Sequence, residues 1–198
     1  MSRDQGRCAQ WFLWLALSAT TCLCLQPLLR IQAQTARNAD DRGLDKHKLL
    51  RTLGLYCTWP EESFAATQGT FVMAILGDEA NPNAVDAHFK RLPPRVKDRK
   101  LVIQRISSLK DLPPCQILYL TDSVDQKTAL DAVKMLRDKP VLLVGDVSEF
   151  TENGGCTAFE LDESGAVRIK VNVAEVRARK IGMDVRLSKL AVTKESKE

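Results

Sequence analysis

The chain has 198 residues, of which 29 are Lys or Arg and 25 are Asp or Glu, so its net charge is +4. Charged residues make up 27% of the chain and hydrophobic residues 44%, as in an ordinary globular protein. These values exclude a collagenous or disordered chain, a multi-span membrane protein and a dedicated nucleic-acid-binding protein. We therefore expect no nucleic-acid partner.

The first 33 residues have the pattern of a secretion signal peptide. Residues 8–29 carry no charge, follow two arginines and precede Arg30, and Ala33 ends a tolerable cleavage context. An uncleaved membrane anchor is the alternative, because 22 uncharged residues rising about 1.5 Å each are long enough to span a bilayer. Both alternatives predict export of the remaining chain.

Cleavage after Ala33 would leave 165 residues with a net charge of +2, enough for one domain with a full core. This near-neutral total gives no indication of attraction to nucleic acid or to an anionic membrane. Three cysteines remain: Cys57, Cys115 and Cys156. Because their number is odd, one pair could form a disulfide while the third thiol stays free. Their connectivity is left open. With two histidines and no metal-ligand spacing, we expect no metal site.

Residues 34–43 are polar and predict a flexible leader. The domain is expected to begin at about Leu44 with an amphipathic helix, whose apolar residues recur at three- and four-residue steps: Leu49, Leu50, Leu53, Tyr56 and Cys57. Trp59 and Pro60 end it, because a residue before proline is disfavoured in helical conformation.

Four short apolar runs then predict strands, over residues 71–76, 101–106, 116–120 and 140–144. Two amphipathic segments between them predict helices, one with Val85, Phe89 and Leu92 on one face and one with Ala129, Leu130, Val133 and Leu136. Strands that alternate with helices at these lengths predict right-handed parallel crossovers.

The last third of the chain has a different pattern. Residues 156–161 and 167–173 alternate apolar and polar side chains around a turn at residues 162–165, which predicts an antiparallel hairpin. A helix over residues 174–181 follows, with Gly182 as a left-handed cap, and residues 194–198 form a loose tail. The predicted fold class is α/β: a mostly parallel sheet with a C-terminal antiparallel hairpin and helices on both faces, in a single domain.

Acidic residues follow three of the predicted strands: Asp78, Asp122 and Asp146. The carboxyl ends of parallel strands commonly bind ligands. Because Gly and Asp are also common turn residues, we favour the structural interpretation. His47 and His88 lie on predicted helices and are expected at the surface. No nucleophile elbow or phosphate-binding loop occurs, so we expect no catalytic residue and no cofactor.

The most distinctive loop runs from Phe150 to Phe159 and contains Gly154 and Gly155. Adjacent glycines allow positive φ and can expose backbone amides to an anion or to a carbonyl group of a partner. The other interpretation is that the two glycines only form a tight turn that leads into the next strand.

Taken in order, these elements resemble the YfiR family of exported proteins over residues 44–193. The matching residues are Thr58, Trp59 and Pro60; Ile75, Leu76 and Gly77; Cys115 with residues 117–120; Pro140, Val141, Leu142, Val144 and Asp146; Phe150, Gly154, Gly155 and Phe159; Arg168, Ile169, Val171 and Asn172; Arg177, Gly182 and residues 188–191. The sequence departs from the family at Cys156, where a hydrophobic residue is usual, and at Met73 and Ala74, which offer Cys115 no cysteine partner.

The resemblance implies a non-catalytic periplasmic regulator that binds an inner-membrane signalling protein, such as a YfiN-type diguanylate cyclase or a sensor kinase. An outer-membrane lipoprotein that titrates the regulator away is a further implied partner, and homodimerisation is left open. The predicted partner-binding residues are Trp59, Pro60, Phe150, Gly154, Gly155, Arg177 and Lys189. Each of them also has a purely structural interpretation.

Two other function classes remain. One is a periplasmic sensor whose strand-end crevice binds a small ligand and signals to a membrane receptor or kinase. The other is a hydrolase, which would depend on Asp122, Ser123 or Asp146 and is the least favoured, because no nucleophile, base and orienting group can be named together.

Overall fold

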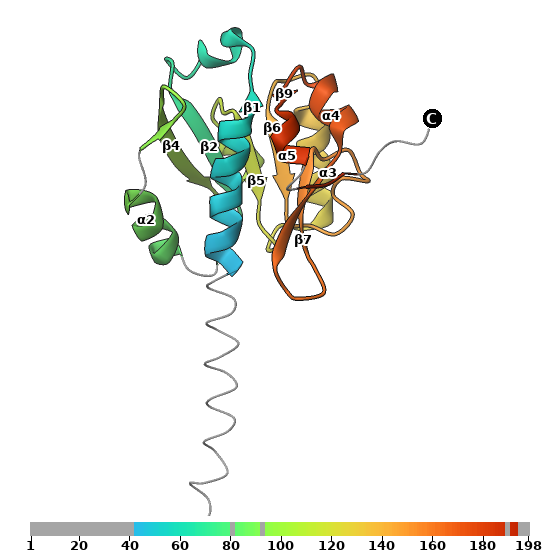
Figure 1. Cartoon of the computed structure of the whole chain (residues 1–198). Helices are drawn as coiled ribbons and strands as arrows, with labels where there is room; N and C mark the ends of the chain where they lie inside the picture. The colour runs from blue at the N-terminus through green and yellow to red at the C-terminus, as the bar shows by residue number, and fades with distance from the viewer. Residues whose placement is uncertain (1–41, 80–81, 92–93, 189–190, 194–198) are drawn as a thin grey trace, which may run out of the picture. The chain divides into compact units, whose positions relative to one another are not determined.

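The computed structural model describes residues 42–79, 82–91, 94–188 and 191–193, which belong to one compact unit (Figure 1). The predicted signal peptide and tail, and most of the predicted leader, lie outside these residues. Within the described part of the chain, no helix has the length and apolar character needed to cross a membrane.

The first helix covers residues 42–56 and so includes the last two residues of the predicted leader. Its apolar face, with Leu50 and Leu53 fully buried, packs on the sheet. Cys57 was expected at the end of this helix but begins strand β1 (Cys57–Thr58), which pairs antiparallel with β9 (Gly182–Met183).

The main sheet has eight strands in the order β10-β8-β7-β6-β5-β2-β4-β3. The strands are β2 (Phe71–Leu76), β3 (Arg95–Val96), β4 (Arg99–Ile106), β5 (Ile117–Leu120), β6 (Leu142–Gly145), β7 (Thr157–Leu161), β8 (Val167–Val171) and β10 (Ala191–Thr193). Five pairings are parallel, while β7 with β8 and β3 with β4 are antiparallel. The predicted α/β fold, mostly parallel with a C-terminal hairpin, is confirmed.

Helices cover both faces of the sheet. The first helix lies in front of it and α3 (Gln126–Met135) behind it in Figure 1. Helix α2 (Pro82–Arg91) is on the same face as the first helix, because the rings of Phe89 and His47 meet edge to face at 5.8 Å. The shorter helices are α4 (Val173–Ala178), α5 (Val185–Ser188) and the 3-10 turns η1 (Glu61–Phe64) and η2 (Leu109–Asp111).

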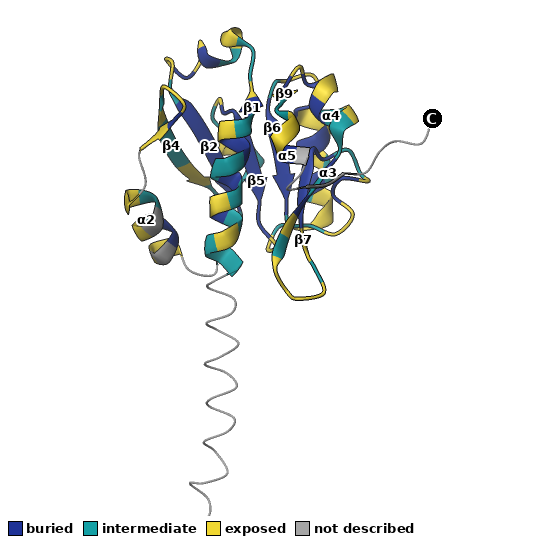
Figure 2. Cartoon of the chain, viewed as in Figure 1, coloured by how far each residue is buried: buried dark blue, intermediate teal, exposed yellow. Residues whose placement is uncertain are grey.

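Strands β2, β5 and β6 are buried along their whole length, as Figure 2 shows for the centre of the sheet. Covered on both faces, they need continuous apolar sequence, which explains why they were predictable. Strand β4, next to the edge strand β3, is only partly buried and carries several charged residues.

The prediction of a left-handed cap at Gly182 was wrong. The residue with positive φ after α4 is Lys180, at 57°. Gly182 lies in β9, where a Cβ atom would come within 2.3 Å of Thr58 Oγ1 on the paired strand. Close approach of the two strands, not backbone conformation, is the reason for a glycine here.

Candidate functional site

A cleft of about 850 Å³ opens at the carboxyl ends of β2, β4 and β5. Its lining includes Gly77, Asp78, Glu79, Arg105, Ser107, Ser123, Asp125 and Thr128. Gly77 has φ of 99°, and a Cβ there would come within 2.3 Å of Thr121 Oγ1. The turn that begins there lets the backbone N–H of Asp78 donate to Ser123 Oγ at 2.8 Å.

An ionic cluster extends from this cleft to the first helix, with Glu79 and Arg105 in the cleft lining. Nε2 of His47 lies 2.5 Å from Oε1 of Glu79, and both side chains are at most 5% exposed. His47 Nδ1 donates to the carbonyl oxygen of Gly43 at 2.8 Å, so the contact with Glu79 requires a proton shared between Nε2 and the carboxylate. Arg105 pairs with Glu79 and, at 2.8 Å, with Asp86. We call these four side chains the His47 cluster.

The His47 cluster overturns one prediction from the sequence, because His47 was expected at the surface. Burial favours a higher pKa for Glu79, but its hydrogen bonds to His47 and Arg105 outweigh burial and hold that pKa below its usual value. The side chain of His88 lies outside the described residues.

Asp146, which the sequence placed among the strand-end acids, lies apart from the residues that line this cleft. Its carboxylate forms an ion pair with Lys46 of the first helix and accepts a hydrogen bond from the hydroxyl of Tyr119 at 3.5 Å. Burial raises the pKa of Asp146, against the opposing effect of Lys46. Asp78 and Asp146 therefore do not share one site, whereas Asp122 lies near enough to Asp146 for its charge to raise the pKa of Asp146 further. Within the described residues, no group of three or more His, Cys, Asp or Glu side chains is arranged to hold a metal ion.

The cleft is therefore polar, and its charges are largely paired with one another. Arg105 supplies positive charge but already contacts two carboxylates, while Asp125 caps the N-terminus of α3 through the backbone N–H of Thr128. With Asp78, Glu79 and Asp125 in its lining, the cleft suits a small polar or cationic ligand.

The glycine loop is a packed structure. Phe150 is only 2% exposed, and Cβ atoms on Gly145 or Gly155 would come within 2.4 Å of its ring. The N–H of Gly155 donates to the carbonyl of Phe150 at 2.8 Å, so this amide is used inside the loop. Gly154, with φ of 94°, provides the turn.

Trp59 and Pro60 fix the segment after β1. The indole N–H of Trp59 donates to the carbonyl of Gln116 at 3.0 Å, and its ring meets Phe71 edge to face at 5.0 Å. Pro60, in extended conformation, precedes η1.

Several predicted partner-binding positions lie at one end of the sheet, opposite the cleft. Asn172, the N-cap of α4, donates to the carbonyl of Thr151 at 3.0 Å and so links the glycine loop to α4. Arg177 is exposed on α4, and β9, which follows this helix, pairs with β1. Lys189 lies outside the described residues. The partner-binding role of all these positions stays a prediction.

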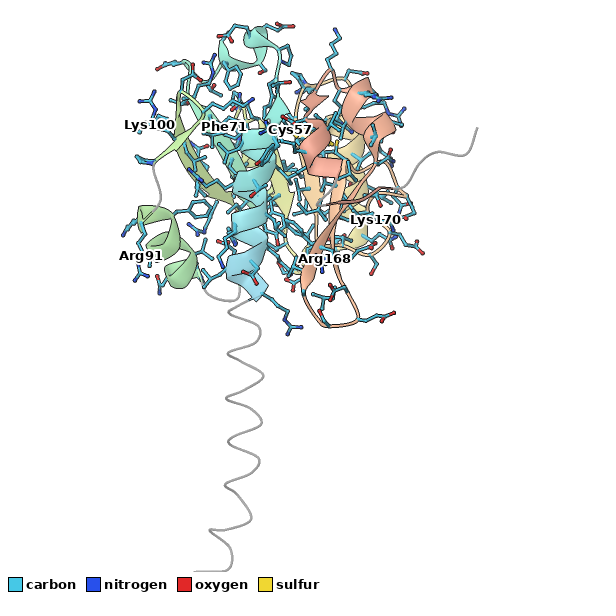
Figure 3. All side chains as sticks on the ribbon, viewed as in Figure 1. Cys57, Phe71, Arg91, Lys100, Arg168 and Lys170 are labelled. Carbon is cyan, nitrogen blue, oxygen red and sulfur yellow. The ribbon has the colours of Figure 1, made fainter. Side chains whose placement is uncertain are left out.

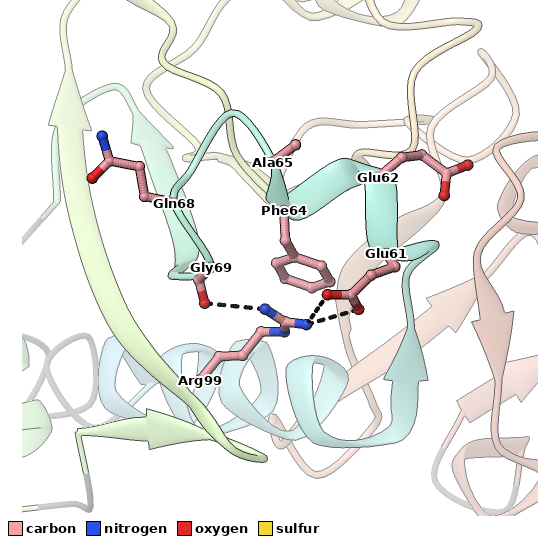
Figure 4. Close-up of a pocket in the computed structure, with 7 residues that line it drawn as sticks. All are labelled: Glu61, Glu62, Phe64, Ala65, Gln68, Gly69 and Arg99. Atoms are coloured by element: carbon pink, nitrogen blue, oxygen red, sulfur yellow. Dashed lines mark hydrogen bonds and ion pairs between the residues drawn. The ribbon is translucent and has the colours of Figure 1, made fainter.

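A second pocket, of about 410 Å³, lies beside η1 (Figure 4). The guanidinium of Arg99 lies 3.8 Å from the centre of the Phe64 ring, contacts Glu61 at 2.6 Å and donates to the carbonyl of Gly69 at 3.2 Å. Because this cation is fully used in joining β4 to η1, we assign the pocket a structural role.

The three thiols are buried and unpaired: Cys57, Cys115 and Cys156. Desolvation raises their pKa, to about 12 for Cys57 and Cys115 and to about 11 for Cys156. None has the lowered pKa of a reactive thiol.

The fold is an α/β domain whose polar groups mainly secure its own elements. A comparison with protein-family models matches residues 46–192 to the YfiR/HmsC-like (DUF4154) family, and the chain belongs to that family. The resemblance found in the sequence is thereby confirmed. A search of curated proteins gives no match. Family membership supports a regulatory role connected with cyclic-di-GMP signalling.

Proposed function

We propose that the chain is a non-catalytic periplasmic regulator that binds the periplasmic part of an inner-membrane signalling protein. The specific activity that we propose is repression of a YfiN-type diguanylate cyclase, and membership of the YfiR/HmsC-like family supports it. The observation that carries this proposal is the family match, which covers nearly the whole described domain.

The pairing of polar groups fits a protein that acts by being bound or released. The two histidine nitrogens of His47 are both engaged, and Asp146 has Lys46 as its counter-charge, so neither group is free to exchange protons with a substrate. The partner surface that we propose is the end of the sheet with Trp59, Gly154 and Arg177. Buried Phe150 and Gly155 would shape this surface from beneath, while Pro60 would hold the Trp59 segment.

Deletion of the gene tests the proposal. Cellular cyclic-di-GMP should rise in the deletion strain and return to the starting level when the wild-type chain is restored. Arg177→Glu should fail to restore repression, because it reverses an exposed charge on the proposed surface. Lys127→Glu, the same charge reversal on α3, is the matched control and should repress normally. An unchanged cyclic-di-GMP level in the deletion strain would refute the cyclase-directed role.

The cleft at the strand ends favours a second candidate, a periplasmic sensor of a small polar ligand. A ligand at a hundred times its dissociation constant stabilises its receptor by about 2.7 kcal/mol, which a thermal-shift screen of metabolites detects. Ser107 is exposed at the cleft, so Ser107→Trp should fill it and abolish any such shift. A shift that persists in this variant would place the ligand elsewhere.

A further inference from the structure

The charge of the chain is concentrated in one short segment. Residues 90–100 contain six Lys or Arg and one Asp, a net charge of +5, whereas the whole chain carries only +4. All the other residues together are therefore close to neutral. The segment joins the end of α2 to the β3–β4 hairpin.

The hairpin presents these cations along the outer edge of the sheet. Strand β3 is the terminal strand, paired with β4 at Arg95 with Lys100 and at Val96 with Arg99. Five of the six cations are exposed, and we call four of them the basic edge: Arg91, Arg95, Lys97 and Lys100. In Figure 3, Arg91 and Lys100 project from the same side of the molecule.

The cations of the basic edge form no ion pairs. Arg95 contacts the carbonyl of Asp98, and Lys97 donates to the carbonyl of Cys57 at 2.7 Å. Asp184 is the carboxylate near Lys97, whose charge lowers the pKa of Asp184 without forming an ion pair with it. Among the described residues, no carboxylate lies within ion-pair distance of any member of the basic edge.

Two cations of strand β8, also labelled in Figure 3, are ion-paired. Arg168 pairs with Asp162 at 2.7 Å, and Lys170 pairs with Glu152 at 2.9 Å. Exposed cations elsewhere, such as Lys127, Arg137 and Arg177, also form no ion pair among the described residues, so the basic edge differs from them by its density of positive charge.

Strand β3, which is described in full, offers no exposed apolar side chain as an anchor. Val96, the one apolar residue of β3, is 1% exposed. Protein interfaces typically place aromatic or aliphatic groups at their centre. A membrane surface of anionic headgroups needs only accessible positive charge, and each Lys or Arg near it adds to the attraction.

We propose that the basic edge binds the anionic headgroups of a phospholipid bilayer and so holds the domain against a membrane surface. This goes beyond the proposed regulatory function and does not depend on which protein is regulated. It differs from the expectation, drawn from the near-neutral total charge, that the protein has no attraction to an anionic membrane.

Vesicle co-sedimentation of the full chain tests this proposal. Vesicles of phosphatidylcholine with about one-third phosphatidylglycerol are compared with pure phosphatidylcholine vesicles. The wild type and the variants all keep the N-terminal segment with Arg3, Arg7 and Arg30, so its contribution is the same in each protein compared. The wild-type chain should prefer the anionic vesicles, and salt should weaken that preference. Arg91→Gln, Arg95→Gln and Lys100→Gln together should reduce the preference roughly 100-fold.

The control variant removes the same charge from another face: Lys127→Gln, Lys134→Gln and Arg137→Gln, all exposed on or just after α3. It should keep the wild-type preference. Equal wild-type affinity for both kinds of vesicle, or equal loss in the two triple variants, would overturn the proposal. Binding to immobilised polyglutamate without a preference for anionic vesicles would overturn it too, in favour of an acidic polypeptide partner.

Discussion

Replacing Glu79 with Gln tests the buried ionic cluster that joins the first helix to the strand ends. The substitution keeps the size of the side chain but removes the negative charge that faces His47 Nε2 at 2.5 Å. His47 cannot turn to water, because both side chains of this pair are almost completely buried.

The expected loss can be worked out from the two partners of Glu79. Removing one member of a buried ion pair costs about 3–5 kcal/mol. Arg105 adds little, since it is one-third exposed and keeps Asp86 at 2.8 Å. The amide oxygen of Gln still accepts a hydrogen bond, so we expect the lower end of this range, about 3 kcal/mol.

Urea unfolding followed by far-ultraviolet circular dichroism measures this loss. The pKa of Glu79 is lowered in the folded protein from 4.5, so its stabilising contribution is complete above about that pH and is lost as the pH falls through the folded pKa. The gap in stability between wild type and Glu79→Gln should therefore be largest near neutral pH and shrink in acid.

A matched control removes the exposed partner of Arg105. Asp86→Asn should cost less than about 1 kcal/mol, because Asp86 is 47% exposed. A loss below about 1 kcal/mol for Glu79→Gln at neutral pH, or a gap that widens on acidification, would refute the reasoning about the buried pair.

Three further outcomes follow from the packing. Gly155→Ala should lower stability by about 1–3 kcal/mol, because its Cβ would meet the Phe150 ring at 2.3 Å; thermal melts should show a smaller loss in a Phe150→Leu background, and equal losses would contradict this packing. Gln116→Leu should cost about 2–4 kcal/mol in urea unfolding, since it leaves the N–H of Val72 and the carbonyl of Ser63 without their partner; a neutral result would show that water replaces the amide. Iodoacetamide should alkylate three buried thiols slowly in the native protein and fast in denaturant: Cys57, Cys115 and Cys156. Fast labelling of any one of them in the native protein would contradict its burial and its raised pKa.

The central elements were predictable because local pattern and tertiary environment agree. Strands β2, β5 and β6 are apolar in sequence and buried on both faces, and the first helix has a regular apolar stripe. The parallel addition of β10 to β8 and the pairing of β1 with β9 were not foreseen. Both depend on contacts between segments far apart in the chain, which no local pattern encodes.

The functional features were harder to find. His47 was assigned to the surface because lysines flank it, although its spacing of three residues from Leu50 places it on the apolar face of the helix. The ion pair with Glu79 depends on tertiary structure alone. The basic edge was missed because a sum over the chain hides a local excess, and a running charge count would have located it at residues 90–100.

The hydrogen bond from Trp59 to the carbonyl of Gln116 makes this indole an intrinsic optical probe. Trp59 is the one tryptophan in residues 42–198, since the other two are Trp11 and Trp14. In a chain from which the first 33 residues have been cleaved, its emission would come from a single site. A shift in emission wavelength would then report directly when the segment after β1 separates from the sheet, for example as a partner is captured or released.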